Sequence, residues 1–195
     1  MAVAGIDILK LVQGAEKARK EFDLRSFENP LWLYAGGRNA LLRRGRRIEL
    51  FGSTAPEVRA LARWWQQLSA QEETSGIFPV LAEYPRTIRC LGKRIADGGD
   101  VFETLVRFVW EEPPYTIGSD VCDLDGLNDL AGKTLEEIQD QAFQSVLAEH
   151  SDAGVPVITM ACGQLGAGTL GELFGFLELA SGLSGCISNQ SFREP

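Results

Sequence analysis

The pattern of apolar and polar residues switches between two periods along the chain. Where apolar side chains recur every three or four positions, as in residues 6–22, the pattern predicts an amphipathic helix. Asp7 and Pro30 support two of the helix starts, because aspartate caps helices and proline fits the first turn. Helices are predicted over residues 6–22, 30–44, 56–71, 87–96, 127–150 with a break near Gly132, and 169–183.

Short apolar runs lie between these helices and predict strands. Residues 48–51 and 101–110 are typical strands, whereas residues 77–82 contain Pro79, which cannot donate to a ladder. Residues 155–161 (VPVITMA) are expected to be the most deeply buried strand. Strands alternating with helices imply parallel units, so the predicted fold class is α/β, a three-layer domain with a mostly parallel sheet flanked by helices. Because no linker divides the chain, residues 1–195 are expected to form a single domain.

Composition and charge narrow the classes of function. The chain is 45% hydrophobic and 24% charged, with a net charge of −8, and this acidic balance argues against nucleic-acid binding, which needs a basic face. The start of the chain lacks the features of a signal peptide, and no stretch approaches the ~20 apolar residues of a membrane span. We therefore expect a cytoplasmic protein without a membrane partner. The four cysteines are not close in sequence, so free thiols and no metal site are expected.

Two glycine motifs resemble nucleotide-binding loops. Gly126–Thr134 (GLNDLAGKT) has five residues between its glycines where a phosphate-binding P-loop has four, and an acidic stretch precedes it. Gly166–Gly171 (GAGTLG) matches G-x-G-x-x-G, but no second strand with an acidic residue follows it. We interpret the second motif as a glycine turn that allows close helix–strand packing.

His150 and a run of arginines are the remaining candidates for chemistry. His150, the only histidine, ends a predicted helix and is interpreted as a cap favoured by the helix dipole. A catalytic or metal-binding role would need partners that are not visible nearby in the sequence. Residues 43–47 (RRGRR) form a basic patch, interpreted as a solvated helix end, with an anion or partner contact as the alternative.

A set of short segments is specific when its members are taken together, although no single one is. In their order and near spacing they resemble the C-terminal two-fifths of bacterial-type glucose-6-phosphate isomerase, over roughly residues 2–195. The segments are AGID at 4–7 with residues 13–15, Tyr34-Ala35 with Arg38-Asn39, WWQQL at 64–68, GIFP at 76–79, Leu91-Gly92, VFET at 101–104, DGLNDLAGKT at 125–134, AEHSDAGVP at 148–156, Leu170-Gly171 with Phe176 and Glu178, Ser184-Gly185 and Phe192.

The resemblance implies a sugar-isomerase (SIS) domain in a homodimer with its active site near the subunit interface. The family interconverts glucose 6-phosphate and fructose 6-phosphate in glycolysis and gluconeogenesis, and it uses no metal or other cofactor. A carboxylate base moves a proton between C2 and C1 through an enediol, and a histidine from the neighbouring subunit helps to open the sugar ring. A lysine near the C-terminus assists, and the phosphate is held mostly by the other SIS domain.

Carried over to this chain, the resemblance implies altered catalytic positions. The base position falls on Gln71, which cannot abstract a proton, and a one-residue shift would place Glu72 there. The histidine position holds Arg89, which cannot shuttle protons but is suited to bind a phosphate or carboxylate. The C-terminal motif stops at residues 192–195 without its lysine, and the N-terminal SIS domain is expected to be missing.

Two functions follow as expectations. The chain is either an isomerase subunit, split or shortened and inactive alone, that works with a separate N-terminal SIS half, or a non-catalytic module that binds sugar phosphates or other proteins. Its expected partners are a sugar phosphate and either a second copy or the separate SIS half. Apolar surface once covered by a neighbouring domain is predicted at Trp32, Phe51, Trp64 and Trp65.

Overall fold

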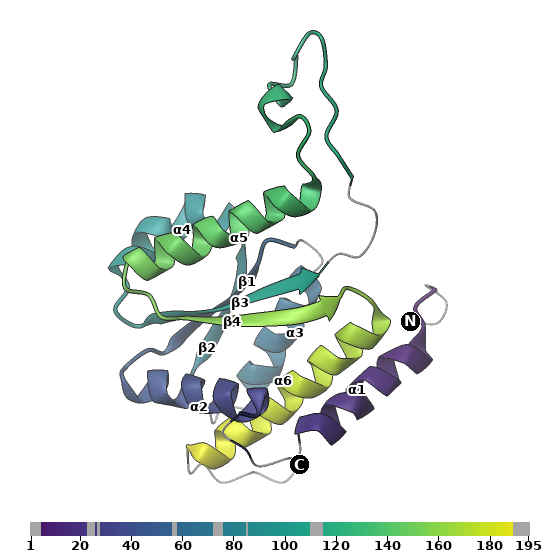
Figure 1. Ribbon diagram of the computed structural model, residues 1–195. Coiled ribbons are helices and arrows are strands. Elements are labelled where there is room, and N and C mark those ends of the chain that lie inside the picture. The colour runs from purple at the N-terminus through teal and green to yellow at the C-terminus, as the bar shows by residue number, and fades with distance from the viewer. Residues whose placement is uncertain are drawn as a thin grey trace.

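A four-stranded parallel sheet forms the centre of the protein (Figure 1). The computed structural model describes residues 5–22, 26, 28–55, 58–71, 76–84, 86–109 and 115–188. The strand order is β2-β1-β3-β4, and each neighbouring pair is parallel. The strands are β1 (Ile48–Ser53), β2 (Phe78–Glu83), β3 (Val101–Val109) and β4 (Val157–Gln164).

Helices cover both faces of this sheet, so the predicted three-layer α/β fold is confirmed (Figure 1). One face carries α1 (Ile8–Phe22), α2 (Pro30–Arg43), α3 (Val58–Gln71) and α6 (Ala167–Ile187), and the other carries α4 (Arg86–Asp97) and α5 (Leu135–Asp152). A short 3₁₀ helix, η2 (Asn128–Leu130), precedes α5. The predicted helix starts are confirmed: Asp7 accepts a bond from the Lys10 amide at α1, and Pro30 begins α2. Two caps were not predicted: Asn29 accepts from the Leu31 amide, and Thr134 with Glu137 forms a capping box at α5.

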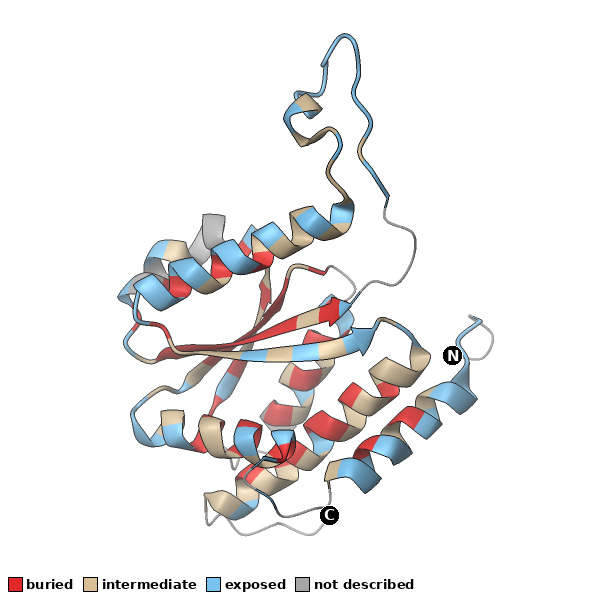
Figure 2. Ribbon diagram, viewed as in Figure 1, coloured by how far each residue is buried: buried red, intermediate tan, exposed pale blue. Residues whose placement is uncertain are grey.

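The two inner strands, β1 and β3, are the most deeply buried, and the prediction that β4 would be is wrong. Residues 101–106 of β3 are all buried, whereas exposed residues recur along β4 (Figure 2). An apolar run identifies a strand without revealing whether a neighbour lies on each side of it, and β4 pairs with β3 alone among the described strands. Pro79 is tolerated because β2 is also an edge strand, pairing with β1 only.

The long helix α6 packs against α1 at glycine positions. A Cβ built on Gly171 would lie 1.8 Å from the Leu11 carbonyl oxygen, and one on Gly14 would lie 2.0 Å from that of Gly168. The structural interpretation of the G-x-G-x-x-G motif is therefore correct in kind, but the close approach is between two helices rather than between a helix and a strand. The helix α6 is also long and apolar enough to cross a membrane, contrary to the sequence prediction, yet Leu177 and Ala180 are core residues.

Two aromatic residues predicted to lie on an apolar surface are in the core instead. Phe51 and Trp65 have no exposed area, because the side chains of α2 and α6 pack over them in the same cluster. Trp64 is half-buried against Phe174, with ring centroids 4.6 Å apart, and Trp32 is also half-buried. Helical spacing alone did not distinguish a core face from one left by a neighbouring domain.

Residues 115–134 project from the rest of the molecule as an arm (Figure 1). The arm joins the end of the β3 region to α5, and most of its residues are exposed (Figure 2). It carries the whole P-loop-like segment, whose Lys133 and Thr134 lead into α5 instead of following a strand. A phosphate cradle of the P-loop type is therefore absent from this segment.

Candidate functional site

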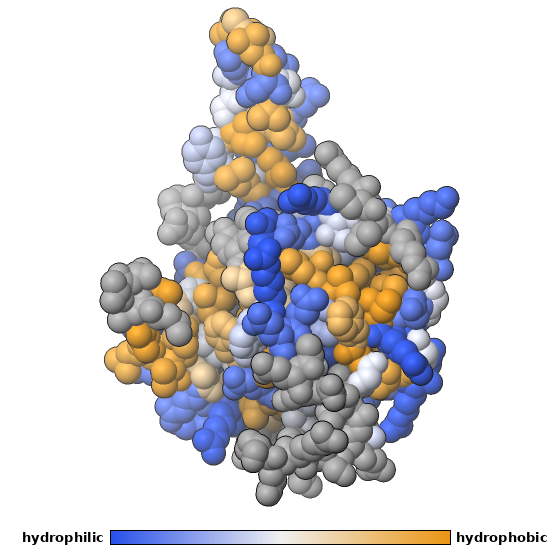
Figure 3. Space-filling model, turned by 180° about the vertical axis from the view of Figure 1, so that it is seen from behind, coloured by the Kyte–Doolittle hydropathy of each residue, from blue (hydrophilic) through white to orange (hydrophobic). Residues whose placement is uncertain are grey.

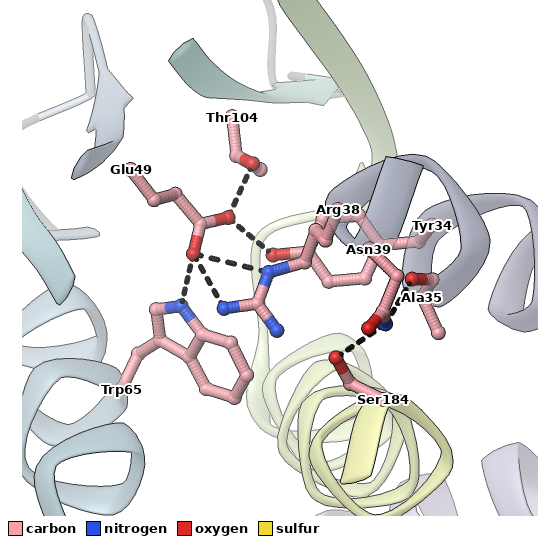
Figure 4. Close-up of polar contacts among 8 residues, drawn as sticks. All are labelled: Tyr34, Ala35, Arg38, Asn39, Glu49, Trp65, Thr104 and Ser184. Carbon is pink, nitrogen blue, oxygen red and sulfur yellow. Dashed lines mark hydrogen bonds and ion pairs between the residues drawn. The ribbon is translucent and has the colours of Figure 1, made fainter. Parts of the chain in front are cut away.

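Glu49 lies at the centre of a buried polar network that joins the sheet to the helices on one of its faces (Figure 4). Its Oε1 accepts hydrogen bonds from the Tyr34 hydroxyl at 2.8 Å and the Thr104 hydroxyl at 2.6 Å. Its Oε2 accepts from Arg38 Nη2 at 2.8 Å, Arg38 Nε at 3.2 Å and Trp65 Nε1 at 3.4 Å. Both carboxylate oxygens are thus fully occupied, which a buried charge requires.

The network extends through α2 to α6. The Arg38 guanidinium lies 5.0 Å from the Trp65 ring centroid and 5.5 Å from that of Tyr34, and Asn39 donates to Ser184 of α6 at 2.8 Å. Burial and then the charge of Glu49 raise the pKa of Tyr34, so its hydroxyl remains a donor. The sequence segment Tyr34-Ala35 with Arg38-Asn39 therefore has a structural role, because its polar atoms are used in packing the helices onto β1.

A second buried carboxylate, Glu103, pairs with His150 on the other face of the sheet. Nδ1 of His150 lies 2.5 Å from Oε2 of Glu103. The Tyr84 ring packs edge-on against the imidazole, with ring centroids 5.8 Å apart. Burial acts to lower the pKa of His150, but the hydrogen bond and charge of Glu103 outweigh it, so the pKa is raised. The sequence interpretation of His150 as a simple cap missed this partner, which is 47 positions away along the chain.

Three polar atoms of this pair and of the adjacent Tyr84 have no hydrogen-bond partner among the described residues. They are Oε1 of Glu103, Nε2 of His150 and the hydroxyl oxygen of Tyr84. Burial and then the charge of Glu103 raise the pKa of Tyr84. This cluster keeps hydrogen-bonding capacity that the Glu49 network has used up.

A cavity of about 310 Å³ opens at the carboxyl ends of β1 and β2. Ligands of open α/β sheets bind along this edge. The Ser53 hydroxyl is already engaged with the Val106 carbonyl at 2.7 Å, and Arg59 pairs with Glu83 at 2.7 Å. Arg86, at the start of α4, lines the cavity without an ion pair to any described residue, so it is available to an anion.

The predicted catalytic positions do not come together within one chain. Gln71 ends α3, which runs back from the carboxyl edge of the sheet and spans about 20 Å. Arg89 lies one turn into α4, on the opposite face and near the opposite edge. The side chains of Gln71 and Arg89, and the whole of Glu72, lie outside the described residues.

The remaining candidates have structural surroundings. Arg46, in the basic run, donates to the carbonyls of Val101 at 3.0 Å and of Gly98 and Gly154 at 3.4 Å, so it ties loops together at the amino edge of the sheet. The solvated interpretation of this run is thus wrong for Arg46. In the part of the chain that the structure describes, no group of three or more His, Cys, Asp or Glu residues could hold a metal ion.

Comparison with known proteins identifies homologues along the whole chain. Glucose-6-phosphate isomerase of Bacillus cereus is 36% identical over 192 residues, covering 96% of this chain and 43% of that enzyme. The enzymes of Limosilactobacillus reuteri and Staphylococcus saprophyticus are 36% and 38% identical, cover 100% of this chain, and are themselves covered over 44% and 45% of their length. The chain thus spans less than half the length of these relatives. No protein-family model matches it.

The fold also recurs in a solved structure. A hypothetical protein from Thermus thermophilus superposes with a TM-score of 0.84 over 96% of this chain and 46% of its own, at 20% sequence identity. At this identity the likeness shows the fold alone.

Proposed function

The chain is homologous to glucose-6-phosphate isomerase over 44% of that enzyme's length, and we propose that it supplies the C-terminal SIS half of such an isomerase. The proposed reaction is the interconversion of glucose 6-phosphate and fructose 6-phosphate in the cytoplasm. In this proposal the chain alone has no enzyme-like turnover, and it acts with a second copy and with another SIS half that holds the phosphate.

Two residue types support the inactivity of the isolated chain. Gln71 stands at the position that the resemblance assigns to the base, and a carboxamide cannot take the C2 proton of the sugar. Arg89 stands at the ring-opening position, where its guanidinium is always charged and cannot donate and recover a proton. Anchoring of the phosphate would orient the sugar, and positioning of this kind is worth about 7–11 kcal/mol of the barrier.

The separation of the Gln71 and Arg89 positions is the observation that supports the involvement of a second chain. The sheet lies between the end of α3, with Gln71, and the start of α4, with Arg89. A reaction centre that uses both positions must therefore take one from each of two chains. This agrees with the resemblance, in which the neighbouring subunit supplies the ring-opening group.

A non-catalytic role in sugar-phosphate binding is the second candidate. It is favoured by the cavity at the carboxyl ends of β1 and β2, where Arg86 makes no ion pair to a described residue. A guanidinium of this kind is suited to a phosphate monoester. In this alternative the chain binds the sugar phosphate without converting it.

A coupled assay of the purified chain tests the catalytic part of the proposal. We expect no turnover of fructose 6-phosphate above buffer by the chain alone. Activity on addition of the separately expressed N-terminal SIS half of the Bacillus cereus relative is expected only with Glu72, next to Gln71, as the base. Turnover above about 1 per second by the chain alone, abolished by Glu72→Gln, would show that Glu72 is a working base and that the isolated chain is active.

Titration calorimetry with fructose 6-phosphate separates the two candidates. Under the binding alternative, Arg86→Ala or Arg89→Ala lowers the affinity at least about tenfold, as expected for loss of a charged phosphate contact. Absence of heat at millimolar ligand in the wild type and both variants rules out that alternative and leaves the complementation assay to decide the isomerase proposal.

A further inference from the structure

The Glu103–His150 pair and Tyr84 form a buried cluster between the sheet and α5 that the proposed reaction does not use. Glu103 is 0% exposed, His150 2% and Tyr84 6%. Oε1 of Glu103, Nε2 of His150 and the hydroxyl oxygen of Tyr84 have no hydrogen-bond partner among the described residues. Buried polar atoms are almost always bonded, so three unbonded atoms in one cluster indicate more than a packing role.

Tyr84 reaches the pair because β1 has a glycine beneath the tyrosine ring. A Cβ built on Gly52 would lie 2.6 Å from Cε2 of Tyr84. The ring therefore lies against the sheet and meets the His150 imidazole edge-on, with ring centroids 5.8 Å apart. Burial and then the charge of Glu103 raise the pKa of Tyr84, so its hydroxyl keeps its proton and remains a donor. The hydroxyl is thus an unused donor close to the charge of Glu103.

The other charged groups on the elements around Glu103 are exposed or already engaged. They are Arg46 before β1, Lys93 and Asp97 on α4, Arg107 on β3, and Asp140 and Glu149 on α5. The Arg46 guanidinium donates to three backbone carbonyls, and Arg107 pairs with Asp140 at 2.6 Å. The side chains on α4 and the last one on α5 are exposed. Among the described residues, Tyr84 is therefore the donor left for Oε1 of Glu103.

Loss of a proton from His150 changes what Glu103 receives. The charged imidazole gives Oε2 a counter-charge and a charge-assisted bond, as its 2.5 Å contact with Nδ1 indicates. The neutral imidazole still donates from Nδ1, but a neutral hydrogen bond is roughly half as strong. Glu103 then remains buried without a counter-charge, because Glu149, the other charge that acts on His150, is also negative. In that state the Glu103 carboxylate needs a second donor.

We propose that the cluster is a pH switch in which the Tyr84 hydroxyl donates to Oε1 of Glu103 when His150 is neutral and leaves it when His150 is charged. In the neutral state the imidazole proton is on Nδ1, bonded to Oε2, and in the charged state a second proton is on Nε2. The short Glu103–His150 contact beside an unbonded Tyr84 corresponds to the charged state. Tyr84 follows β2 directly and its amide donates to the Ser53 carbonyl at 3.2 Å, so the switch acts where the chain leads into α4. An effect on Arg89 rests on the proposed function, whereas the switch itself does not.

The composition of the chain makes the switch directly measurable by NMR. His150 is the only histidine, and the three tyrosines are Tyr34, Tyr84 and Tyr115. With isotope-labelled histidine and tyrosine, a titration between pH ~5.5 and ~9 follows both kinds of side chain. The hydroxyl-bearing carbon of Tyr84 should shift with the same midpoint as the His150 imidazole, and the neutral imidazole should carry its proton on Nδ1. The Tyr34 signal should not follow this midpoint, because its acceptor, Glu49, lies on the other face of the sheet.

The variant Tyr84→Phe keeps the ring and removes only the hydroxyl. The state with neutral His150 then loses its additional hydrogen bond, so the midpoint of His150 should rise by about one pH unit, a tenfold change in proton affinity. Tyr115→Phe is the matched control. Tyr115 is 70% exposed on the arm, which stands clear of the body (Figure 3), so its loss should leave the midpoint unchanged.

Three outcomes would overturn the proposal. They are a Tyr84 signal that stays constant while His150 titrates, a midpoint in Tyr84→Phe equal to or below that of the wild type, and a neutral imidazole with its proton on Nε2. Circular dichroism checks that both variants fold, and the wild-type titration decides by itself if Tyr84→Phe does not. None of these measurements involves isomerase activity. A failed switch is therefore distinguishable from a failed isomerase proposal, which the complementation assay decides.

Discussion

The two buried carboxylates, Glu49 and Glu103, lie on adjacent strands and differ in what surrounds them. Both are 0% exposed, and they point to opposite faces of the sheet. Glu49 receives hydrogen bonds from four side chains on α2, α3 and β3, whereas Glu103 is bonded through one oxygen to His150. Their equal burial therefore says little about their roles, and the number of bonds that each makes distinguishes them.

The two carboxylates differ in the kind of charged side chain that each contacts and in how much hydrogen-bonding capacity remains around it. Arg38 keeps its charge over the accessible pH range, and its ion pair with Glu49 ties helix α2 to the sheet. The pKa of His150 is raised by Glu103, and one polar atom each of Glu103, His150 and Tyr84 has no hydrogen-bond partner among the described residues. We therefore predict that the Glu49 network has a structural role at all pH values of interest, whereas the contribution of the Glu103–His150 pair depends on pH.

The largest expected effect is that of Glu49→Gln. This change removes the carboxylate charge that the buried Arg38 guanidinium contacts through Nη2 and Nε, so the free energy of unfolding should fall by about 3–5 kcal/mol. Urea denaturation measures the loss. The control is Glu83→Gln, which breaks a partly exposed pair with Arg59 and should cost about 1 kcal/mol or less. Equal costs for the two variants would contradict a structural role for the Glu49 network.

A smaller effect is expected for Glu103→Gln, with a pH signature. Because Glu103 raises the pKa of His150 above its unfolded value, the pair stabilises the fold fully below pH ~6.5 and loses this contribution as pH rises through the folded pKa. At pH ~6 the variant should lose about 1.5–3 kcal/mol, the range for a hydrogen bond to a charged group.

Urea denaturation of wild type and Glu103→Gln between pH ~5.5 and ~9 measures how the free energy of unfolding of each protein depends on pH. The wild-type free energy of unfolding should decline across this range relative to that of the variant, so the gap narrows at high pH. Glu149 also raises the pKa of His150, and the Tyr84 ring packs against the imidazole. Both residues are present in the wild type and in the variant, so the difference between their free energies of unfolding isolates the Glu103–His150 pair. A gap independent of pH would mean that His150 does not become charged in the folded protein.

The smallest effect is expected for Thr104→Val. This change removes one donor to Glu49 while keeping the shape of the side chain, and Tyr34, Arg38 and Trp65 still bind the carboxylate. The loss should be about 1 kcal/mol, the usual value of one hydrogen bond. Thermal unfolding measures it. A loss as large as that of Glu49→Gln would show that the network depends on every member and is not redundant.

The sequence alone determined the element order and the fold class. Apolar periodicity is a local property, so helices such as Ile8–Phe22 and Pro30–Arg43 and the strand Val101–Val109 fall within a residue or two of their predicted bounds. The resemblance to glucose-6-phosphate isomerase was likewise carried by the order of short segments, and the homologues confirm it.

Only the tertiary structure decided which polar residues meet and which apolar residues are covered. Glu49 with Arg38, and Glu103 with His150, are joined by strand register and by the face each helix covers, and neither is encoded in local spacing. The same reason explains why Phe51 and Trp65 are in the core while Val121 and Leu124 stand in solvent. The spacing of apolar residues along the sequence identifies a helix or a strand, but the burial of each side chain depends on what packs against that element from elsewhere in the chain.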